Sequence, residues 1–410
     1  FDPIPQKDYY ALSGIFQSTQ TCYGTVRVVQ SNHPSPLIDL PRDAGATIGL
    51  GPLSAERRAA IEKDIQDLKD QISKASGPNA FLQTLFQRTR SATLQSQLDL
   101  YESNGTPRPL AMGVREARFP SDSRLYVRGE LDQPGERVAR GLPQVLTAVQ
   151  PAIRRGESGR RELADWIASK DNPLTARVMA NRVWLHLMGR GLVPTPDNFG
   201  ASGLPPSNPA LLDYLAVTFA DEGWSVKKLI RTIVLSRAYR LSSHLDEKDY
   251  EADPDDVLFW RMPERRLEAE ALRDTMLALS GRLDLTPPKG SPIEGGGEGN
   301  VNLRLRMGGD PSLTDRHRAV YLPIVRDAVP EELTLFDFPD PSLLSAERAT
   351  TTIPAQALYL LNNPFVMRQA EDMAERLLDQ KGGDAARLTQ AYLLCFSRPP
   401  SEKERKKAEE

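Results

Sequence analysis

Histidine, the usual ligand of protein-bound metals, is scarce in this sequence. The four histidines among its 410 residues are His33, His186, His244 and His317. No two of them stand at ligand spacing, and there is neither a His-Glu-x-x-His motif nor a Cys-x-x-Cys-His haem attachment. We therefore predict no metal and no cofactor on this chain. A metal site assembled from distant histidines and carboxylates stays open.

Cysteine is scarcer still, and the two residues, Cys22 and Cys395, lie at opposite ends of the sequence. Two cysteines cannot form the disulfide framework of a small secreted domain. Two buried free thiols are the simpler expectation. A disulfide between them remains an alternative if the protein works in an oxidising compartment.

Long apolar runs and a strong net charge are also missing. No window approaches the roughly eighteen consecutive apolar residues that read as a membrane-spanning helix. The formal charge at pH 7 is only -3, so the overall balance favours neither nucleic acid nor an anionic membrane as a partner. We predict no nucleic-acid binding and no transmembrane segment in this chain.

Common catalytic signatures are absent or incomplete. There is no Gly-x-Ser-x-Gly of a serine hydrolase, and the glycine run 295–299 lacks the Lys-Ser/Thr ending of a phosphate-binding loop. The acidic run 246–256 lacks the central glycine and the spacing of an EF-hand. Paired carboxylates stay open, because a sequence gives no distance between them.

Helical signals dominate the stretch 160–243. Apolar residues recur at helical spacing in four segments: 163–170, 178–188, 209–219 and 226–234. Turn formers separate them, including Asn172-Pro173 after the first and Gly189 after the second. These patterns predict a mainly α protein built on a multi-helix domain.

The other segments predict a small β unit and an inserted helical hairpin. Residues 41–100 read as a proline-rich linker and then a short coiled coil, with Ser54 as the N-cap and a seam at Ile61, Ile65, Leu68 and Ile72. Residues 101–150 carry short extended pieces, as does 25–29. Residues 151–400 form the helical domain, with a helix at 264–279 organised by i,i+4 ion pairs, a flexible glycine-rich loop at 285–309 and a strand at 321–325. We expect the charged tail 401–410 to fray.

Several blocks of residues, in order along the chain, resemble the Planctomycete-type family of paired domains of unknown function. They include Asp171-Asn172-Pro173-Leu174, Asn181-Arg182-Val183-Trp184, Gly189-Arg190-Gly191-Leu192-Val193, Thr195-Pro196-Asp197-Asn198-Phe199-Gly200, Phe336-Asp337-Phe338-Pro339-Asp340-Pro341 and Pro354-Ala355-Gln356-Ala357-Leu358. The resemblance covers most of residues 150–400, and residues 1–40 resemble the tail of the preceding family domain. One departure is Pro206-Ser207-Asn208-Pro209, where the family's Pro-Thr-His-Pro turn has a histidine.

The resemblance implies a partner and a location. Members of the family often carry a c-type cytochrome domain upstream, so haem is expected only on an upstream or partner domain. It also implies an extracytoplasmic protein, in the periplasm or at the cell surface. The first residues, Phe1-Asp2-Pro3-Ile4-Pro5, resemble the interior of a longer protein.

Two groups of polar residues are candidate sites. The first is Asn181, Arg182, His186 and Asp197, where a semi-buried asparagine and arginine need partners such as Asp165, Asp197 or carbonyls of the turn 195–200. The second is Arg316-His317-Arg318, which suits a sulfate, carboxylate or phosphate group. Structural hydrogen bonding in the first group and a solvated basic turn in the second are the alternatives.

Two functions fit these observations. The first is an exported accessory or scaffold protein that works beside a c-type cytochrome module and does not hold the redox centre. The second is an enzyme that acts on sulfated or acidic polysaccharides in a cleft of the helical domain, with an anionic glycan as its partner. The sequence leaves open whether the chain is an enzyme.

Overall fold

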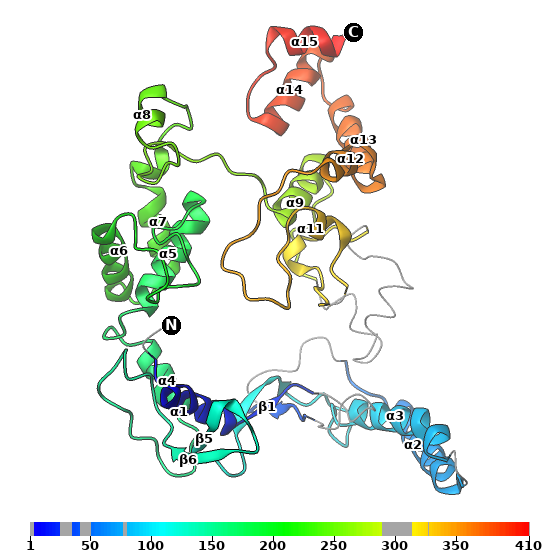
Figure 1. Ribbon diagram of the computed structural model, residues 1–410. Coiled ribbons are helices and arrows are strands. Elements are labelled where there is room, and N and C mark those ends of the chain that lie inside the picture. The colour runs from blue at the N-terminus through cyan, green and yellow to red at the C-terminus, as the bar shows by residue number, and fades with distance from the viewer. Residues whose placement is uncertain are drawn as a thin grey trace. The chain divides into compact units, whose positions relative to one another are not determined.

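The computed structural model describes residues 4–24, 35–41, 51–76, 80–288, 314–326 and 328–409. The chain divides into two compact units, residues 1–262 and 263–410, which we describe separately. Helices account for most of the regular structure in both units, and the strands are short (Figure 1). The prediction of a mainly α protein is confirmed.

The first unit contains the predicted small β unit. Helix α1 (Gln6–Gln17) leads into β1 (Thr19–Cys22), which pairs antiparallel with β4 (Gly113–Glu116), while β2 (Ile38–Asp39) pairs with β3 (Leu110–Ala111). A third ladder joins β5 (Ser123–Tyr126) and β6 (Pro134–Val138), separated by the 3₁₀ turn η2 (Val127–Gly129). Two of the three ladders therefore join the first 40 residues to the segment 101–150. The strand predicted at 25–29 lies outside the described residues.

The predicted helical hairpin is present. Helix α2 (Ala55–Lys74) packs against α3 (Ala80–Leu98), with Ile61 and Ile65 against Leu98 at their interface. The Ser54 side chain accepts a hydrogen bond from the backbone N–H of Arg57, so the predicted N-cap is confirmed.

Four helices follow, as the apolar periodicity predicts: α4 (Arg160–Ile167), α5 (Thr175–Met188), α6 (Pro209–Asp221) and α7 (Val226–Val234). Helices α5, α6 and α7 enclose the main apolar core, which includes Trp184, Met188, Leu215, Phe219 and Ile233. The unit ends with η3 (Ala238–Arg240), the short helix α8 (Glu247–Ala252) and Phe259, whose ring packs edge-on against Trp184.

Side chains in the connecting loops fix where these helices begin. The Asn172 carboxamide oxygen accepts from the backbone N–H groups of Leu174 and Thr175, and Asn208 accepts from Leu211 N–H at the start of α6. Asn208 is the N-cap of a helix whose first residue is Pro209.

The second unit contains α9 (Ala269–Ser280), η6 (Ala319–Tyr321), α11 (Glu331–Leu335), α12 (Pro354–Asn362), α13 (Pro364–Leu378), α14 (Asp384–Phe396) and α15 (Glu402–Glu409). Helix α9 packs against α11 and α13. Ala269, Leu333 and Phe336 form a second buried apolar cluster.

Three sequence predictions for this unit are wrong. The helix predicted at 264–279 begins only at Ala269, because Glu268 is extended and Arg266 contacts the Thr351 carbonyl oxygen and the Asp337 carboxylate instead. The strand predicted at 321–325 is a 3₁₀ turn followed by irregular chain, since no neighbouring strand pairs with it among the residues described. The tail forms α15, because Ser401 and Glu404 exchange backbone and side-chain hydrogen bonds at its start.

Two other sequence expectations meet the structure only in part. Of the glycine-rich loop at 285–309, only residues 285–288 are described, so its glycine run lies outside the described part. Both cysteines are free; Cys22 is buried as expected, whereas Cys395 is exposed.

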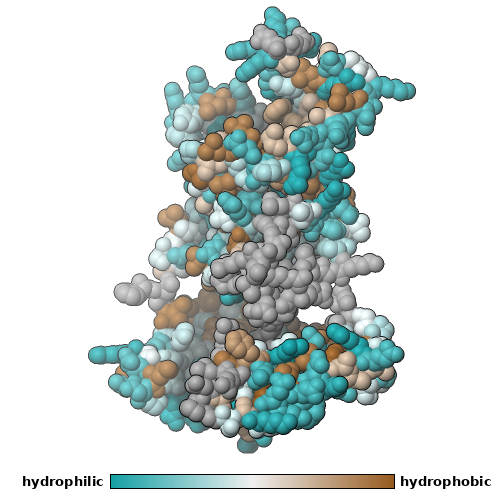
Figure 2. Space-filling model, turned by 90° about the vertical axis from the view of Figure 1, so that its right-hand side faces the viewer, coloured by the Kyte–Doolittle hydropathy of each residue, from teal (hydrophilic) through white to brown (hydrophobic). Residues whose placement is uncertain are grey.

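No helix among the residues described is long and apolar enough to cross a bilayer. Figure 2 shows one face of the molecule, on which hydrophobic side chains lie among hydrophilic ones. In the second unit, large apolar side chains that remain mostly exposed include Leu343, Leu344, Leu361 and Phe396.

Candidate functional site

Asn181, from the first predicted group, is fully buried on α5 and pairs with one backbone residue. Its Nδ2 donates to the carbonyl oxygen of Val193 over 3.1 Å, and its Oδ1 accepts from Val193 N–H over 2.8 Å. The partner is therefore the backbone of Val193, and not Asp165, Asp197 or the turn 195–200. The Asn181 side chain thus makes the two hydrogen bonds that a paired backbone residue would make, and it holds the loop after α5 against that helix.

The two glycines of that loop are required for different reasons. Gly189 ends α5 with φ +83°, a conformation that costs glycine little. A Cβ on Gly191 would lie 2.9 Å from Asn181 Nδ2 and 2.5 Å from the Val193 carbonyl oxygen. Any larger residue at position 191 would push the loop off the asparagine.

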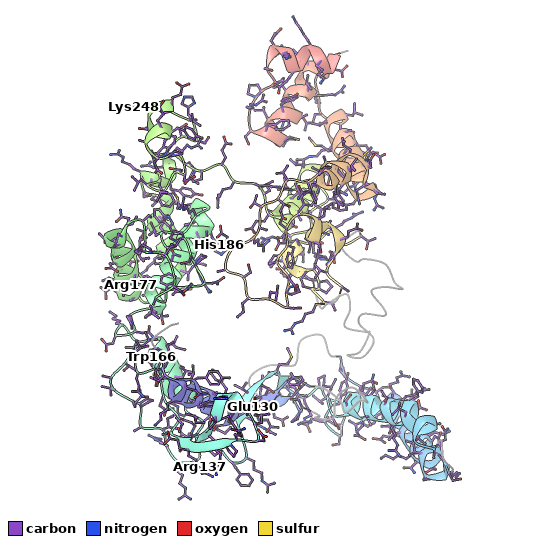
Figure 3. All side chains as sticks on the ribbon, in the orientation of Figure 1. Glu130, Arg137, Trp166, Arg177, His186 and Lys248 are labelled. Carbon is purple, nitrogen blue, oxygen red and sulfur yellow. The ribbon has the colours of Figure 1, made fainter. Side chains whose placement is uncertain are left out.

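The other members of the first group lie apart from Asn181. Arg182, His186 and Asp197 are exposed, so the prediction of a semi-buried Arg182 is wrong. Positions 182 and 186 share the solvent side of α5, whereas Asn181 faces the core. Figure 3 shows Arg177 near the beginning of α5 and His186 near its end. A binding role for the three exposed residues stays a prediction.

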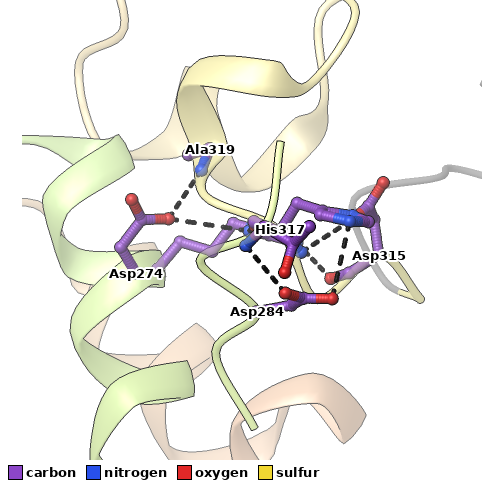
Figure 4. Close-up of polar contacts among 7 residues, drawn as sticks. Asp274, Asp284, Asp315, His317 and Ala319 are labelled. Carbon is purple, nitrogen blue, oxygen red and sulfur yellow. Dashed lines mark hydrogen bonds and ion pairs between the residues drawn. The ribbon is translucent and has the colours of Figure 1, made fainter. Parts of the chain in front are cut away.

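In the second group, Arg316, His317 and Arg318 have three different surroundings. His317 Nδ1 lies 2.7 Å from Oδ1 of Asp315, and its Nε2 lies 3.7 Å from Oδ2 of Asp284 (Figure 4). Because an ionised carboxylate only accepts, Asp315 holds the ring with the proton on Nδ1. Arg318 is exposed and lies 3.8 Å from Asp274, so the three side chains do not form one anion site.

Arg273 fastens this segment to α9 and is the residue that sequence reasoning missed. Its side chain is only 2% exposed, and its guanidinium donates to the carbonyl oxygens of His317 over 3.0 Å and Asp315 over 2.6 Å. A second tie runs from Ala319 N–H to Asp274 Oδ1 over 2.7 Å (Figure 4). The sequence does indicate that Arg273 is buried, since position 273 lies midway between the buried Ala269 and Leu277 on one helix face.

Glu270 forms a long-range ion pair where an i,i+4 pair was predicted. Its two carboxylate oxygens accept from Arg348 Nη1 and Nη2 over 2.6 and 2.8 Å. The Arg348 guanidinium also lies over the Phe338 ring, 5.4 Å from its centroid. Partial burial works against ionisation, but the hydrogen bonds and charge of Arg348 outweigh it and lower the pKa of Glu270 below its usual range.

The Glu270–Arg348 ion pair should stabilise the protein at neutral pH, and this contribution should be lost in acid. A carboxyl with a lowered folded pKa contributes stability above its unfolded pKa, about 4.3, and loses that contribution as the pH falls through the folded pKa. We expect Glu270→Gln to lower the free energy of unfolding by about 2 kcal/mol at pH 7, and by less and less as the pH falls through the folded pKa of Glu270. Urea unfolding across this pH range measures it, with Glu268→Gln as the control. The Glu268 carboxylate is more exposed and lies 3.6 Å from Arg348, so its loss should cost about 0.5 kcal/mol. A constant cost of Glu270→Gln at all pH values would contradict the assignment.

A pocket of about 290 Å³ lies in the second unit, beside residues 314–316. It is lined by residues of the α9 end, of the segment after residue 313 and of α13: Leu277, Arg282, Thr314, Asp315, Arg316, Phe365, Arg368, Gln369 and Asp372. Arg282 Nη2 lies 2.5 Å from Asp372 Oδ1. This hydrogen bond lowers the pKa of Asp372 below its usual range, and the charges of Arg316 and Arg368 act in the same direction. The pocket therefore gathers three guanidinium groups and two carboxylates, those of Asp315 and Asp372.

Metal chemistry has no support among the residues described. They contain no group of three or more histidine, cysteine or acidic side chains that could hold an ion. His33 lies outside them.

Comparison with known proteins places most of the helical region in a family. The model of the family PSD1, described as "Protein of unknown function (DUF1553)", matches residues 159–410. The match begins one residue before α4 and takes in all the helices that follow. No curated protein and no solved structure matches the chain.

Proposed function

The chain belongs to the PSD1 family of proteins of unknown function, and we propose that it is an exported accessory or scaffold protein. It would work outside the cytoplasm beside a c-type cytochrome module, which carries the haem. The support for this partner and location is the resemblance of the sequence blocks to proteins with an upstream cytochrome domain.

The main support for the scaffold role is that several polar side chains of those blocks form hydrogen bonds within the protein. Asn181 holds the backbone of Val193. Asp337 accepts from the backbone N–H and the hydroxyl of Thr351. Each contact fixes a loop to a helix or to another loop, whereas Arg182 and Asp197 of the same blocks are exposed.

Gln356 repeats the pattern in α12. It is buried, its Nε2 donates to the Leu335 carbonyl oxygen over 2.9 Å, and its Oε1 accepts from Ile353 N–H. Such contacts preserve a rigid framework. The exposed apolar side chains of the second unit then supply the kind of area that protein partners bury.

A binding experiment tests the partner. We expect the purified chain to sediment as one complex with a purified c-type cytochrome of the same source, so that the haem absorbance moves with the chain. The chain alone should show no haem absorbance and no transition metal in elemental analysis. Stoichiometric haem or metal on the chain alone, or no complex at micromolar concentrations, would reject the role.

The enzyme reading is the second candidate, and His317 is what favours it. In hydrolases that pair histidine with aspartate, a carboxylate orients Nδ1, as Asp315 does here, and Nε2 accepts a proton. In this chain Nε2 lies 3.7 Å from Oδ2 of Asp284. The proposed substrate is a sulfated or acidic polysaccharide. Turnover of an anionic glycan by the wild-type chain, lost in His317→Ala and kept in His244→Ala, would establish this reading. No turnover across a panel of such glycans would leave the accessory role as the function.

A further inference from the structure

The pocket beside α13 contains two arginines, Arg316 and Arg368, that form no ion pair with another described residue. Arg282 is paired with Asp372, and Asp315 is occupied by the His317 ring. The three guanidinium groups of the lining outnumber its two carboxylates, so the pocket is net positive.

The walls of the pocket are fixed by packing. Leu277 and Phe365 are 2% and 4% exposed and form its apolar part. Gln369 is held by the hydroxyl of Ser280, which donates to its Oε1 over 2.8 Å. The backbone of Arg316 is fixed as well, because its carbonyl oxygen accepts from Asp284 N–H over 2.8 Å. The arginines thus project from a rigid base, which reduces the entropy lost when a ligand binds.

We propose that this pocket binds an oxyanion group, such as a sulfate, phosphate or carboxylate, between Arg316 and Arg368. Guanidinium groups present planar donors that match the oxygens of these groups. The volume of about 290 Å³ is at the lower end for ligand sites, so the ligand is a small molecule or a single group of a larger one. This site replaces the Arg316-His317-Arg318 cluster that the sequence suggests: Arg316 remains, whereas Arg282 and Arg368 take the place of the other two.

Asp372 acts as a built-in competitor in this site. Its Oδ1 accepts a hydrogen bond from Arg282 Nη2, and the charges of Arg316 and Arg368 also act on this carboxylate. An incoming anion is repelled by Asp372 and attracted by the arginines. Neutralising this one carboxylate should therefore strengthen binding, an effect that a merely basic surface would not show.

The test is calorimetric titration of the full chain at low ionic strength with inorganic sulfate, inorganic phosphate and glucuronate. We expect dissociation constants on the order of 1 mM for at least one of them. The double variant Arg316→Gln/Arg368→Gln should weaken binding at least tenfold. Asp372→Asn should tighten it severalfold. Which probe binds best distinguishes a tetrahedral group from a carboxylate.

Arg318→Gln is the matched control, because Arg318 is exposed, lies two residues from Arg316 and does not line the pocket. Its affinity should equal that of the wild type. The proposal is overturned if none of the three probes binds, if Arg318→Gln weakens binding as much as the pocket variants, or if Asp372→Asn leaves the affinity unchanged. The site depends neither on the cytochrome partnership nor on catalysis, and binding without turnover is its expected result.

Discussion

Replacing Asn181 with alanine should lower the free energy of unfolding by about 3 kcal/mol and the melting temperature by about 10 °C. The substitution removes the carboxamide that pairs with both the N–H and the carbonyl oxygen of Val193, a buried residue of the loop after α5. Each buried polar group left without a partner costs about 1–3 kcal/mol. Thermal unfolding followed by circular dichroism measures the loss.

Arg182→Ala is the matched control for Asn181→Ala. It changes the adjacent residue of the same helix, but Arg182 is exposed and should contribute within about 0.5 kcal/mol. A helix-propensity effect would appear in both variants, whereas the loss of the Val193 pairing appears only in one. Equal melting temperatures for the two variants would show that Asn181 does not hold the loop.

The sequence predicts the helices of residues 54–240 well because their signals are local. Ser54, Asn172 and Gly189 stand at helix ends, where capping depends on residues two to four positions away. Apolar periodicity then predicts which face packs. The same logic also covers α15, whose Ser401 and Glu404 form a capping box that the charged composition concealed.

The candidate sites were harder to predict because their partners are distant. Glu270 and Arg348 are 78 residues apart, and Arg273 reaches across 42 residues to the Asp315 carbonyl oxygen. Periodicity can place Arg273 on the buried face of α9, but it cannot name the carbonyl groups that receive it. Adjacent residues can also have different surroundings, because consecutive side chains of an irregular segment point in different directions. Arg316, His317 and Arg318 are an example.

Replacing Arg273 with methionine should lower the free energy of unfolding by about 4 kcal/mol, a larger loss than that expected for Asn181→Ala or Glu270→Gln. Methionine fills much of the buried volume but donates no hydrogen bond. The carbonyl oxygens of Asp315 and His317 would lose their donor, and the Phe365 ring would lose the cation 5.7 Å from its centroid. Arg273→Lys should recover part of the loss, because an ammonium group can reach one carbonyl but lacks the planar fork.

Urea unfolding measures these differences. Arg318→Ala is the control, because it changes an exposed residue that follows His317, and it should cost about 0.5 kcal/mol at most.

The Arg273 variants also separate stability from the proposed oxyanion site. Arg273 does not line the pocket, yet it fixes the backbone of Asp315 and His317, the residues on either side of Arg316. If it positions Arg316, then Arg273→Lys at a temperature where the chain is fully folded should weaken sulfate binding severalfold while Arg368 remains in place. A folded Arg273→Lys protein with wild-type affinity would restrict the role of Arg273 to stability. Loss of affinity in that folded protein would mean that the buried arginine holds the exposed one in its binding position.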